Sequence, residues 1–487
     1  MIHPLHQSFF MQNSYAILRC LSSVTRNTLI PLLFLLAIPL FTGCASWYQR
    51  TLDFQNAVLA GNFEDAGQLL EKDNKQARKK NQILYYMNRG YVDFMLSDYE
   101  ASNQAFETAE ILAEQQSKAL LAEIAVQVSN PEARPYQPED FEVIMIHFYK
   151  ALNYLQIEDM EGALVEARKI NNKLNQLNDK YPDHKNRYQQ DAFALLLMGI
   201  IYDASGDNNN AFIAYRNAYN VYQTDYTQNF GIGAPEQLKR DLLRTAQACG
   251  FTSEIRQYER EFGWKYTPEP TPNGQVVLFW LNGFGPVKAS WDITFAKRNG
   301  SNGAVIFYND ELGLSFPFHI STGYSDAQKK SIADLEVLRA AFPKYVERPP
   351  YFTSGTITTN GRNYSLEMAQ NINEIAFKTL HDRMVREFSN SLLRLASKKT
   401  VEHVARDKNE WVGALIGAVN AATETADTRN WQTLPYAISY SRIPLSAGEN
   451  KLNILFSAPR GTIQNQQLLQ EGGNRKTTFH IFHTMAK

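Results

Sequence analysis

Cysteine is nearly absent from this sequence, which has only Cys20, Cys44 and Cys249 in 487 residues. Cys20 falls in an N-terminal leader and Cys44 has a separate role, described below, so Cys249 has no disulfide partner. A fold stabilised by internal disulfide bonds is therefore excluded. We expect Cys249 to be a small buried residue in a helix, because a reactive thiol would need a nearby base and the sequence offers none.

A charge excess of either sign is also missing. The formal net charge is −1, and charged residues make up 20% of the chain. A nucleic-acid-binding protein would carry a basic face or tail, and a protein held to anionic lipid by electrostatics would carry a polybasic patch. We therefore expect no nucleic-acid partner and no electrostatic membrane binding.

The N-terminus lacks an apolar run long enough to span a bilayer. Residues 29–41 are apolar apart from two prolines, and they follow Arg19 and Arg26. A spanning helix needs about 20 residues, whereas this shorter run is typical of the core of a secretory signal peptide. An ordinary signal anchor is the alternative. Met11 could be the true start in place of Met1.

The residues after that run resemble the bacterial lipobox. Thr42 and Gly43 precede Cys44, although Phe41 replaces the usual leucine. We predict a signal peptide over 1–43, lipidation of Cys44, and a lipidated N-terminus with a tether over 44–49. Two or three acyl chains anchor a protein stably to a membrane. Ala45 follows the cysteine in place of aspartate, which resembles the signal for outer-membrane delivery. Periplasmic and cell-surface exposure both remain open.

Residues 50–266 show a repeated helical pattern of the tetratricopeptide type. The clearest unit places small residues where two helices would cross and aromatic residues between them: Leu195, Met198, Gly199, Tyr202, Gly206, Ala211, Tyr215 and Ala218. Similar offsets begin at Phe54, Tyr86 and His147. Each unit of such an array buries its apolar face against its neighbours, so several units are needed for stability. Amphipathic helices without repeat geometry are the alternative.

The inner face of such an array would be formed by the first helix of each unit. In this register it is strongly apolar, with Met87, Tyr91, Phe94, Phe148, Leu152, Leu155, Phe193 and Ile200. An exposed apolar surface of this size marks a binding site for a partner. The second possibility is that the chain's own C-terminal region covers it. His147, on the same helix as Phe148, is expected to be a packing residue.

Three alternating prolines within residues 267–274 predict an extended linker. Behind it, residues 275–487 read as an α+β domain. The apolar run Val276–Leu281 predicts a buried strand, and Asn360-Gly361 predicts a hairpin turn. Further strands are expected over 291–296, 313–320, 351–358, 436–444, 451–456 and 477–483.

Two helices are expected inside this domain. One long helix is predicted from Leu366 to about Lys408, and a second from Trp411 to Ala426 contains a Gly-x-x-x-Gly spacing. That spacing permits close helix packing, in a soluble domain or in a membrane. The apolar stretch falls short of a membrane span, which favours the soluble domain. The fold class is thus α+β, with an all-α repeat array ahead of a β-rich domain.

The segments Val276–Pro286 and Ala426–Gly448, behind a lipobox and a repeat array, are similar to an uncharacterised family of proteobacterial repeat-containing lipoproteins. The distinctive parts are the Asn-Gly-Phe-Gly-Pro turn at 282–286 and the Asp-x-Arg-x-Trp-x-x-Leu-Pro stretch at 427–435. The resemblance implies an envelope location, often in gene sets with penicillin-binding-protein activator lipoproteins. It implies no reaction, so it assigns no catalytic residue.

No zinc-protease helix, nucleophile elbow or phosphate loop occurs in the sequence. His480 and His483 would point to opposite faces of a strand, which disfavours a metal pair. Asp427, Arg429 and Trp431 would share one face of an extended segment, as a ligand site or as a buried ion pair under a packed tryptophan. We favour the ion pair.

From these features we expect a non-enzymatic scaffold without cofactor or metal. It would be anchored to the outer membrane and bind other envelope proteins through the repeat groove. The family resemblance implies a role in peptidoglycan synthesis or envelope-machine assembly. An envelope enzyme with a site in the C-terminal domain is the first alternative. An accessory lipoprotein of a secretion system or surface appendage is the second.

Overall fold

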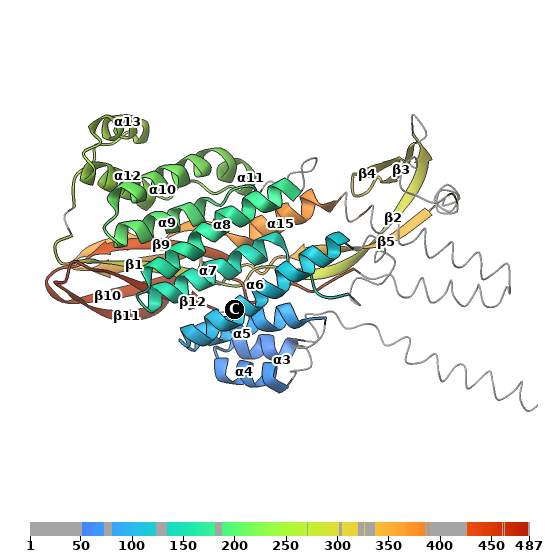
Figure 1. Ribbon diagram of the computed structural model, residues 1–487, viewed down its shortest axis with the longest axis horizontal. Helices are drawn as coiled ribbons and strands as arrows, with labels where there is room; N and C mark the ends of the chain where they lie inside the picture. The colour runs from blue at the N-terminus through green and yellow to red at the C-terminus, as the bar shows by residue number, and fades with distance from the viewer. Residues whose placement is uncertain are drawn as a thin grey trace, which may run out of the picture. The chain divides into compact units, whose positions relative to one another are not determined.

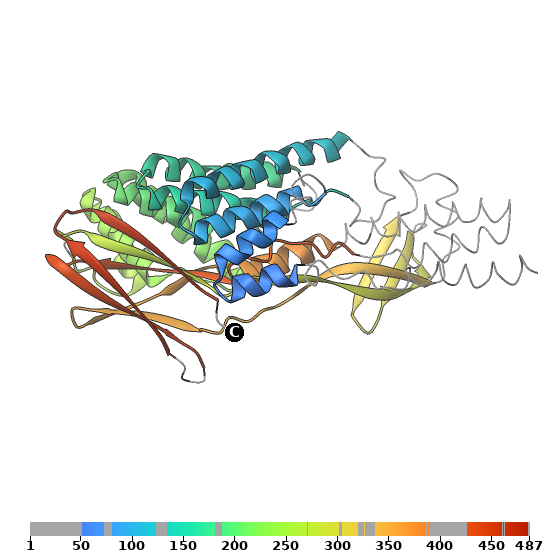
Figure 2. The same ribbon diagram turned by 90° about the horizontal axis from the view of Figure 1, so that it is seen from below.

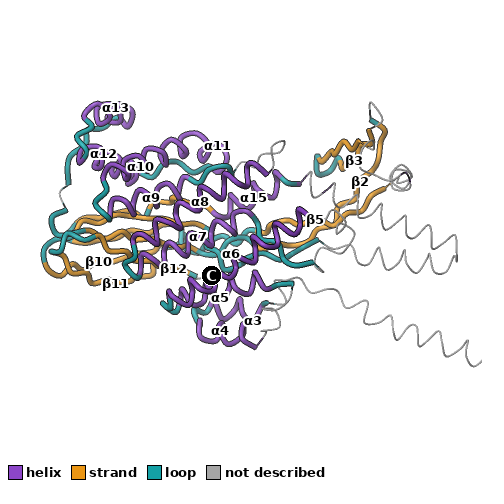
Figure 3. Tube along the Cα trace, viewed as in Figure 1, coloured by secondary structure: helices purple, strands orange, loops and turns teal. Residues whose placement is uncertain are grey.

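The computed structural model describes residues 51–72, 80–122, 134–180, 188–269, 271–300, 304–319, 326, 337–384, 388, 426–459, 461 and 463–485. Cys44, the leader and the predicted helix over 411–426 lie outside these residues, apart from Ala426. Residues from Thr51 onward form one compact unit. Helices fill its N-terminal half and strands dominate its C-terminal half, as Figure 3 shows by colour.

The helices come in consecutive antiparallel pairs (Figure 1). The pairs are α3 (Leu52–Leu59) with α4 (Phe63–Lys72), α5 (Gln82–Met95) with α6 (Tyr99–Ala122), α7 (Asp140–Gln156) with α8 (Met160–Lys180), α9 (Ala192–Ala204) with α10 (Asn208–Val221), and α12 (Glu236–Ala248) with α13 (Thr252–Phe262). The first four pairs match the four predicted units, and the fifth is additional. Between α10 and α12 lie a π-helical turn, η5 (Tyr222–Tyr226), and the short α11 (Thr227–Phe230).

Glycines set how closely the paired helices cross. A Cβ on Gly199 of α9 would lie 2.4 Å from the Tyr215 ring of α10, and a Cβ on Gly90 of α5 would lie 2.7 Å from the Phe106 ring of α6. The aromatic side chain of the second helix thus occupies the space that the glycine leaves. Gly206 has φ +80° in the turn between α9 and α10, a conformation that favours glycine.

The strands form three four-stranded sheets. Sheet 1 has the order β12 (Thr477–Thr484), β1 (Gln275–Asn282), β9 (Ala437–Pro444), β8 (Glu367–Asn371). Sheet 2 has the order β11 (Ile463–Gly472), β10 (Gly448–Ser457), β6 (Ser354–Thr359), β7 (Arg362–Ser365). Sheet 3 has the order β4 (Leu314–His319), β3 (Ala304–Asn309), β2 (Val287–Asn299), β5 (Val337–Val346). The pairing of β1 with β12 is parallel, whereas β1 and β9 are antiparallel.

Sheet 1 is the middle layer between the helices and sheet 2 (Figure 2). All eight residues of β1 are buried, as its apolar run predicts. Val276, Leu278 and Trp280 pack with Ile454 and Phe456 of sheet 2. Alternate residues face the helices, where the ring centroids of Phe279 and Phe193 are 6.3 Å apart. The buried strand therefore has two partners, one for each face.

The hairpin turn at Asn360-Gly361 is confirmed, with φ of 50° and 73° between β6 and β7. The predicted long helix is wrong at its start. Residues 367–371 are strand β8, and α15 (Ile372–Asp382) begins only after Asn371, whose side chain accepts a hydrogen bond from the Glu374 amide. An N-cap of this kind favours a helix start at that point. Beyond Arg383, most of the predicted helix lies outside the described residues.

The linker at 267–274 separates helices from strands but not two compact units, because both halves belong to one unit. Cys249 is the residue just after α12 and is half-buried, not buried as we expected. No helix among the described residues is long and apolar enough to cross a membrane.

Candidate functional site

The predicted partner groove is not an open surface. All eight residues assigned to it are buried. Tyr91 Oη lies 3.0 Å from His483 Nδ1 of β12, and Phe193 contacts Phe279 of β1. The chain's own C-terminal region therefore covers this face, which was the second possibility. Sheet 1 of the same chain covers this face, since an apolar face of that size is most stable when another layer excludes water from it.

Every strand of sheet 1 makes a polar or aromatic contact to a helix. Besides Tyr91, Gln156 donates to the Phe479 carbonyl of β12 (3.1 Å) and Tyr222 donates to the Ala369 carbonyl of β8 (2.6 Å). Arg442 of β9 lies 2.9 Å from Asp203 at the end of α9. The helices and sheet 1 thus share one interior, with polar side chains at fixed points in it.

The Asp-x-Arg-x-Trp stretch lies in this same interior. Arg429 is buried and forms an ion pair with Asp427 (2.6 Å), and it also donates to Asn81 Oδ1 and the Arg134 carbonyl, both at 3.0 Å. The Trp431 ring packs against Phe106 and Tyr149. The ion pair that we favoured over a ligand site is present, with Arg429 buried and Asp427 half-buried. These contacts join residues 427–431 to the helical pairs.

Two buried carboxylates beside this stretch have opposite pKa shifts. Burial alone would raise the pKa of Glu139, but Arg383 and Lys288 outweigh it and lower that pKa to about 2. Glu142 has a pKa raised to about 7 by burial and by the nearby charge of Glu139. Glu142 accepts a hydrogen bond from the Trp431 amide (2.6 Å). Glu139 is paired with Lys288 and Arg383, and Glu142 accepts hydrogen bonds within the protein, so neither carboxylate is left for a ligand.

The Asn-Gly-Phe-Gly-Pro turn closes the end of the same interface. The Gly283 carbonyl accepts a hydrogen bond from His483 Nε2 (2.8 Å), and Gly283 has φ +58°. Removal from water lowers the pKa of His483 to about 4. His480 instead contacts Gln470 Oε1 (3.0 Å). The two histidines therefore have separate surroundings and do not form a metal pair.

A cluster that could in principle hold a metal ion lies between α6, α7 and α8. It consists of Glu110, His147 and Glu166. Lys150 Nζ already lies 2.9 Å from Glu110 and 3.1 Å from Glu166, and His147 Nδ1 lies 2.8 Å from Glu166. The lysine supplies the positive charge that these carboxylates need. The cluster acts as a buried ion-pair network between helices. His147 is buried between helices, as we expected, but it also contacts a carboxylate, which we did not expect.

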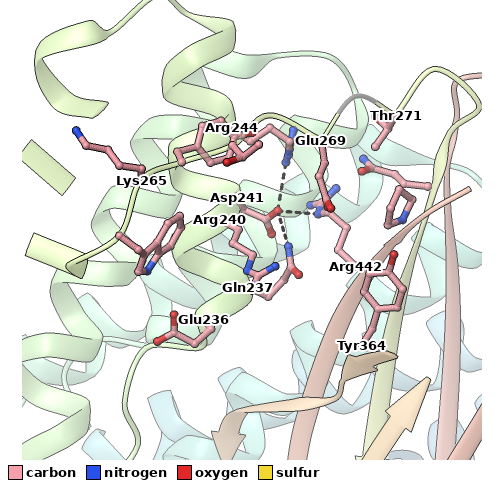
Figure 4. A pocket seen from close by; sticks show the side chains of 15 residues that line it. Glu236, Gln237, Arg240, Asp241, Arg244, Lys265, Glu269, Thr271, Tyr364 and Arg442 are labelled. Atoms are coloured by element: carbon pink, nitrogen blue, oxygen red, sulfur yellow. Dashed lines mark hydrogen bonds and ion pairs between the residues drawn. The ribbon is translucent and has the colours of Figure 1, made fainter. Parts of the chain in front are cut away.

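The best candidate for a ligand site is a pocket of about 470 Å³ where α12, the chain after α13 and the ends of β1, β7 and β9 meet (Figure 4). We call it the arginine pocket. Its lining comprises Glu236, Gln237, Arg240, Asp241, Arg244, Trp264, Lys265, Tyr266, Thr267, Glu269, Thr271, Gln275, Tyr364, Arg442 and Pro444. Ligand pockets in proteins have volumes of about 300–1,000 Å³.

Two arginines and two aspartates form the base of the arginine pocket. Arg244 Nη1 lies 2.9 Å from Asp203 Oδ1. Arg442 Nη2 lies 2.9 Å from Asp203 Oδ2, and Arg442 Nε lies 2.9 Å from Asp241 Oδ1. Burial would raise the pKa of Asp203, but Arg442 and Arg244 outweigh it and lower that pKa. The two arginines and the two aspartates thus form ion pairs with one another, and their formal charges balance.

Sequence reasoning missed this pocket. Its charged residues lie far apart in the sequence, from Asp203 to Arg442. One signal was present: Arg442 is the only charged residue in the apolar strand β9, and Asp203 is the only one in the apolar helix α9. A lone charge in a buried element requires a partner. The sequence alone does not say that the two charges meet.

Comparisons with known proteins add little. No family model matches the chain, and no curated protein matches it. Among solved structures, "MamA" is 13% identical, with 43% of this chain and 91% of that chain covered and a TM-score of 0.28. BtubC (BKLC) from P. vanneervenii is 15% identical, with 46% and 82% covered and a TM-score of 0.30. Similarities this low carry no argument about function.

Proposed function

We propose that the protein is a non-enzymatic scaffold lipoprotein of the bacterial envelope. Acyl chains on Cys44 would hold it to the outer membrane, facing the periplasm, and its tetratricopeptide-like helical pairs would bind other envelope proteins. The glycine–aromatic helix crossings support the repeat assignment. The lipobox-like Thr42-Gly43-Cys44 supports the anchor. A role in peptidoglycan synthesis or envelope-machine assembly follows from the family resemblance alone.

The observation that carries the proposal is that sheet 1 covers the inner helical face, which leaves the second helix of each pair for a partner. Three large apolar side chains are exposed on these second helices: Ile111 on α6 (46% exposed), Val165 on α8 (44%) and Ile213 on α10 (37%). We call these residues the outer helical face. Single exposed apolar residues are common on protein surfaces. Their recurrence on three successive second helices motivates the test.

The partner test uses a photo-crosslinking amino acid placed at Ile111, Val165 or Ile213 in living cells. We expect the same envelope protein to be captured from all three positions. Leu469, exposed on β11, is the matched control, and it should capture nothing in common with them. Capture from Leu469 alone would place the partner on sheet 2 and reject the outer helical face.

The anchor is tested separately by palmitate labelling. Wild-type protein should incorporate the label and fractionate with the outer membrane. The Cys44→Ser variant should remain unlabelled. Equal labelling of the two would contradict the anchor without affecting the partner test.

The arginine pocket bears on the enzyme alternative. Its base carboxylate Asp241 is held by Arg244 and Arg442. No histidine, cysteine or serine is among the described lining residues. This combination supports binding over catalysis as the role of the pocket.

A further inference from the structure

The arginine pocket contains buried polar atoms that neither donate a hydrogen bond to any described group of the protein nor accept one from it. Arg442 is 5% exposed, and its Nη1 has no hydrogen-bond partner among the described residues. Asp241 is fully buried, and its Oδ2 also has none. Buried polar atoms in proteins nearly always have a partner, so each such atom needs an explanation. Here the unsatisfied donor and acceptor belong to neighbouring side chains of one cavity.

The two unsatisfied atoms have opposite roles in hydrogen bonding. Arg442 Nη1 can only donate, and an ionised Asp241 Oδ2 can only accept. The complementary group is therefore an acceptor next to a donor. Gln275 Oε1, also on the lining and nine-tenths buried, is a second acceptor without a partner among the described residues.

The charge of the cavity favours an anion. Arg244 and Arg442 balance Asp203 and Asp241, as described above. At the mouth, Lys265 pairs with Glu259 (2.8 Å), and Glu269 pairs with Arg362 (3.1 Å). Arg240 makes no hydrogen bond or ion pair with any described residue and acts on Glu367 only by electrostatic attraction. Glu236, also on the lining, pairs with Lys239 outside it. Among the described residues, the positive charge of Arg240 is therefore left without a direct partner.

We propose that the arginine pocket binds an amino carboxylate, a group in which a carboxylate stands one carbon from an N–H. The carboxylate would accept from Arg442 Nη1 and face Arg240, and the N–H would donate to Asp241 Oδ2. Because Arg442 Nη2 and Nε already face Asp203 and Asp241, Nη1 would give one charge-assisted hydrogen bond, and such bonds to carboxylates are stronger than neutral ones. Trp264, Tyr266 and Tyr364 supply walls for the attached side chain.

Two sources share this chemistry: a free amino acid and the C-terminal end of a peptide. The first carries an ammonium group and the second an amide N–H, and Asp241 Oδ2 can accept from either. The inference does not rest on the proposed partner surface, because it uses α12 and β9 and not the outer helical face. Failure of the crosslinking test would leave the ligand proposal unaffected. Failure of the ligand test would likewise leave the partner proposal unaffected.

The test is isothermal titration calorimetry on the full-length protein in detergent micelles. The probes are L-alanine, N-acetyl-Ala-Ala, and N-acetyl-Ala-Ala amide, which lacks the carboxylate. We expect at least one of the two acids to bind. The amide of the peptide should bind about tenfold more weakly than its acid, since a charge-assisted hydrogen bond is lost. Binding of L-alanine alone would identify a free amino acid, and binding of the acetylated acid would identify a chain end.

The variants test the position of the ligand. Arg240→Gln should weaken binding of the acid about tenfold and leave binding of the amide unchanged. Arg260→Gln is the matched control, because Arg260 is an exposed arginine on the adjacent α13 that does not line the pocket. Arg442→Gln is a less suitable variant, since its buried ion pairs also support the fold.

Two results would overturn the proposal. If neither acid binds at millimolar concentration, Arg442 Nη1 and Asp241 Oδ2 form hydrogen bonds with water and not with a ligand. If peptide acid and amide bind equally well, the pocket does not recognise a carboxylate. Both comparisons use the wild-type protein, so they hold whether or not a variant folds.

Discussion

The crossing of α9 and α10 offers a direct test of the helical packing. A Cβ added at Gly199 would lie 2.4 Å from the Tyr215 ring. Tyr215 is itself buried, and its hydroxyl accepts a hydrogen bond from Arg442 Nη2 (3.0 Å). The ring cannot turn aside without losing that contact, so the helices must separate or the ring must strain. Overpacking of this kind costs about 1–3 kcal/mol. Against this, alanine in a helix interior gains about 1 kcal/mol over glycine.

A contact of 2.4 Å is far shorter than any ordinary one, so the overpacking cost should lie in the upper part of that range, about 2–3 kcal/mol. After the gain of about 1 kcal/mol in helix propensity, we expect Gly199→Ala to lower the free energy of unfolding by about 1–2 kcal/mol. Gly67→Ala in α4 is the matched control. Its Cβ would meet only Val92 Cγ1, at the ordinary distance of 3.6 Å. The gain in helix propensity, roughly 0.5–1 kcal/mol, should therefore appear without an overpacking cost.

The assay is urea denaturation followed by helical circular dichroism, in which the midpoint shifts in proportion to the change in stability. The two alanine variants should shift the midpoint in opposite directions. If Gly199→Ala proves as stable as Gly67→Ala, the two helices do not cross as closely as described and the repeat packing is wrong.

Two further predictions concern the buried interface. Arg429→Met should lower stability by about 3 kcal/mol in the same assay, because it leaves buried hydrogen-bonding groups without a partner. Arg339→Met, which removes an exposed pair with Asp292 (2.7 Å), should cost less than about 1 kcal/mol; equal losses would contradict the burial difference. For His483, the folded pKa of about 4 lies below the ordinary 6.5. The unfolded chain then binds more protons between these values, so this contribution to stability is present above pH 6.5 and lost as the pH falls toward 4. Thermal melts of His483→Gln should show a flatter pH dependence over that window than the wild type.

Much of the secondary structure could be predicted because its signals are local. The glycine and tyrosine of the unit at 195–218 lie at offsets that bring them together in a helical hairpin, and they do meet. The run 276–281 is apolar on both faces, which predicted a buried strand, and β1 is one. The strand β11 (Ile463–Gly472) was missed because its glutamine-rich sequence lacks apolar alternation. Its position is fixed by pairing with β10, a tertiary contact.

The site could not be predicted for a related reason. An apolar face on a helix array signals that something covers it but does not say whether that is another protein or a distant part of the same chain. Here β1 needed a layer on each face, and sheet 2 supplies only one. The helices supply the other, so two surfaces that each look incomplete in the sequence complete one another. At α9, α12 and β9, charged residues of the helices and of sheet 1 meet and pair with one another. The arginine pocket lies at that junction, because a charge buried between the two layers needs a partner and the helices and sheet 1 supply one another's.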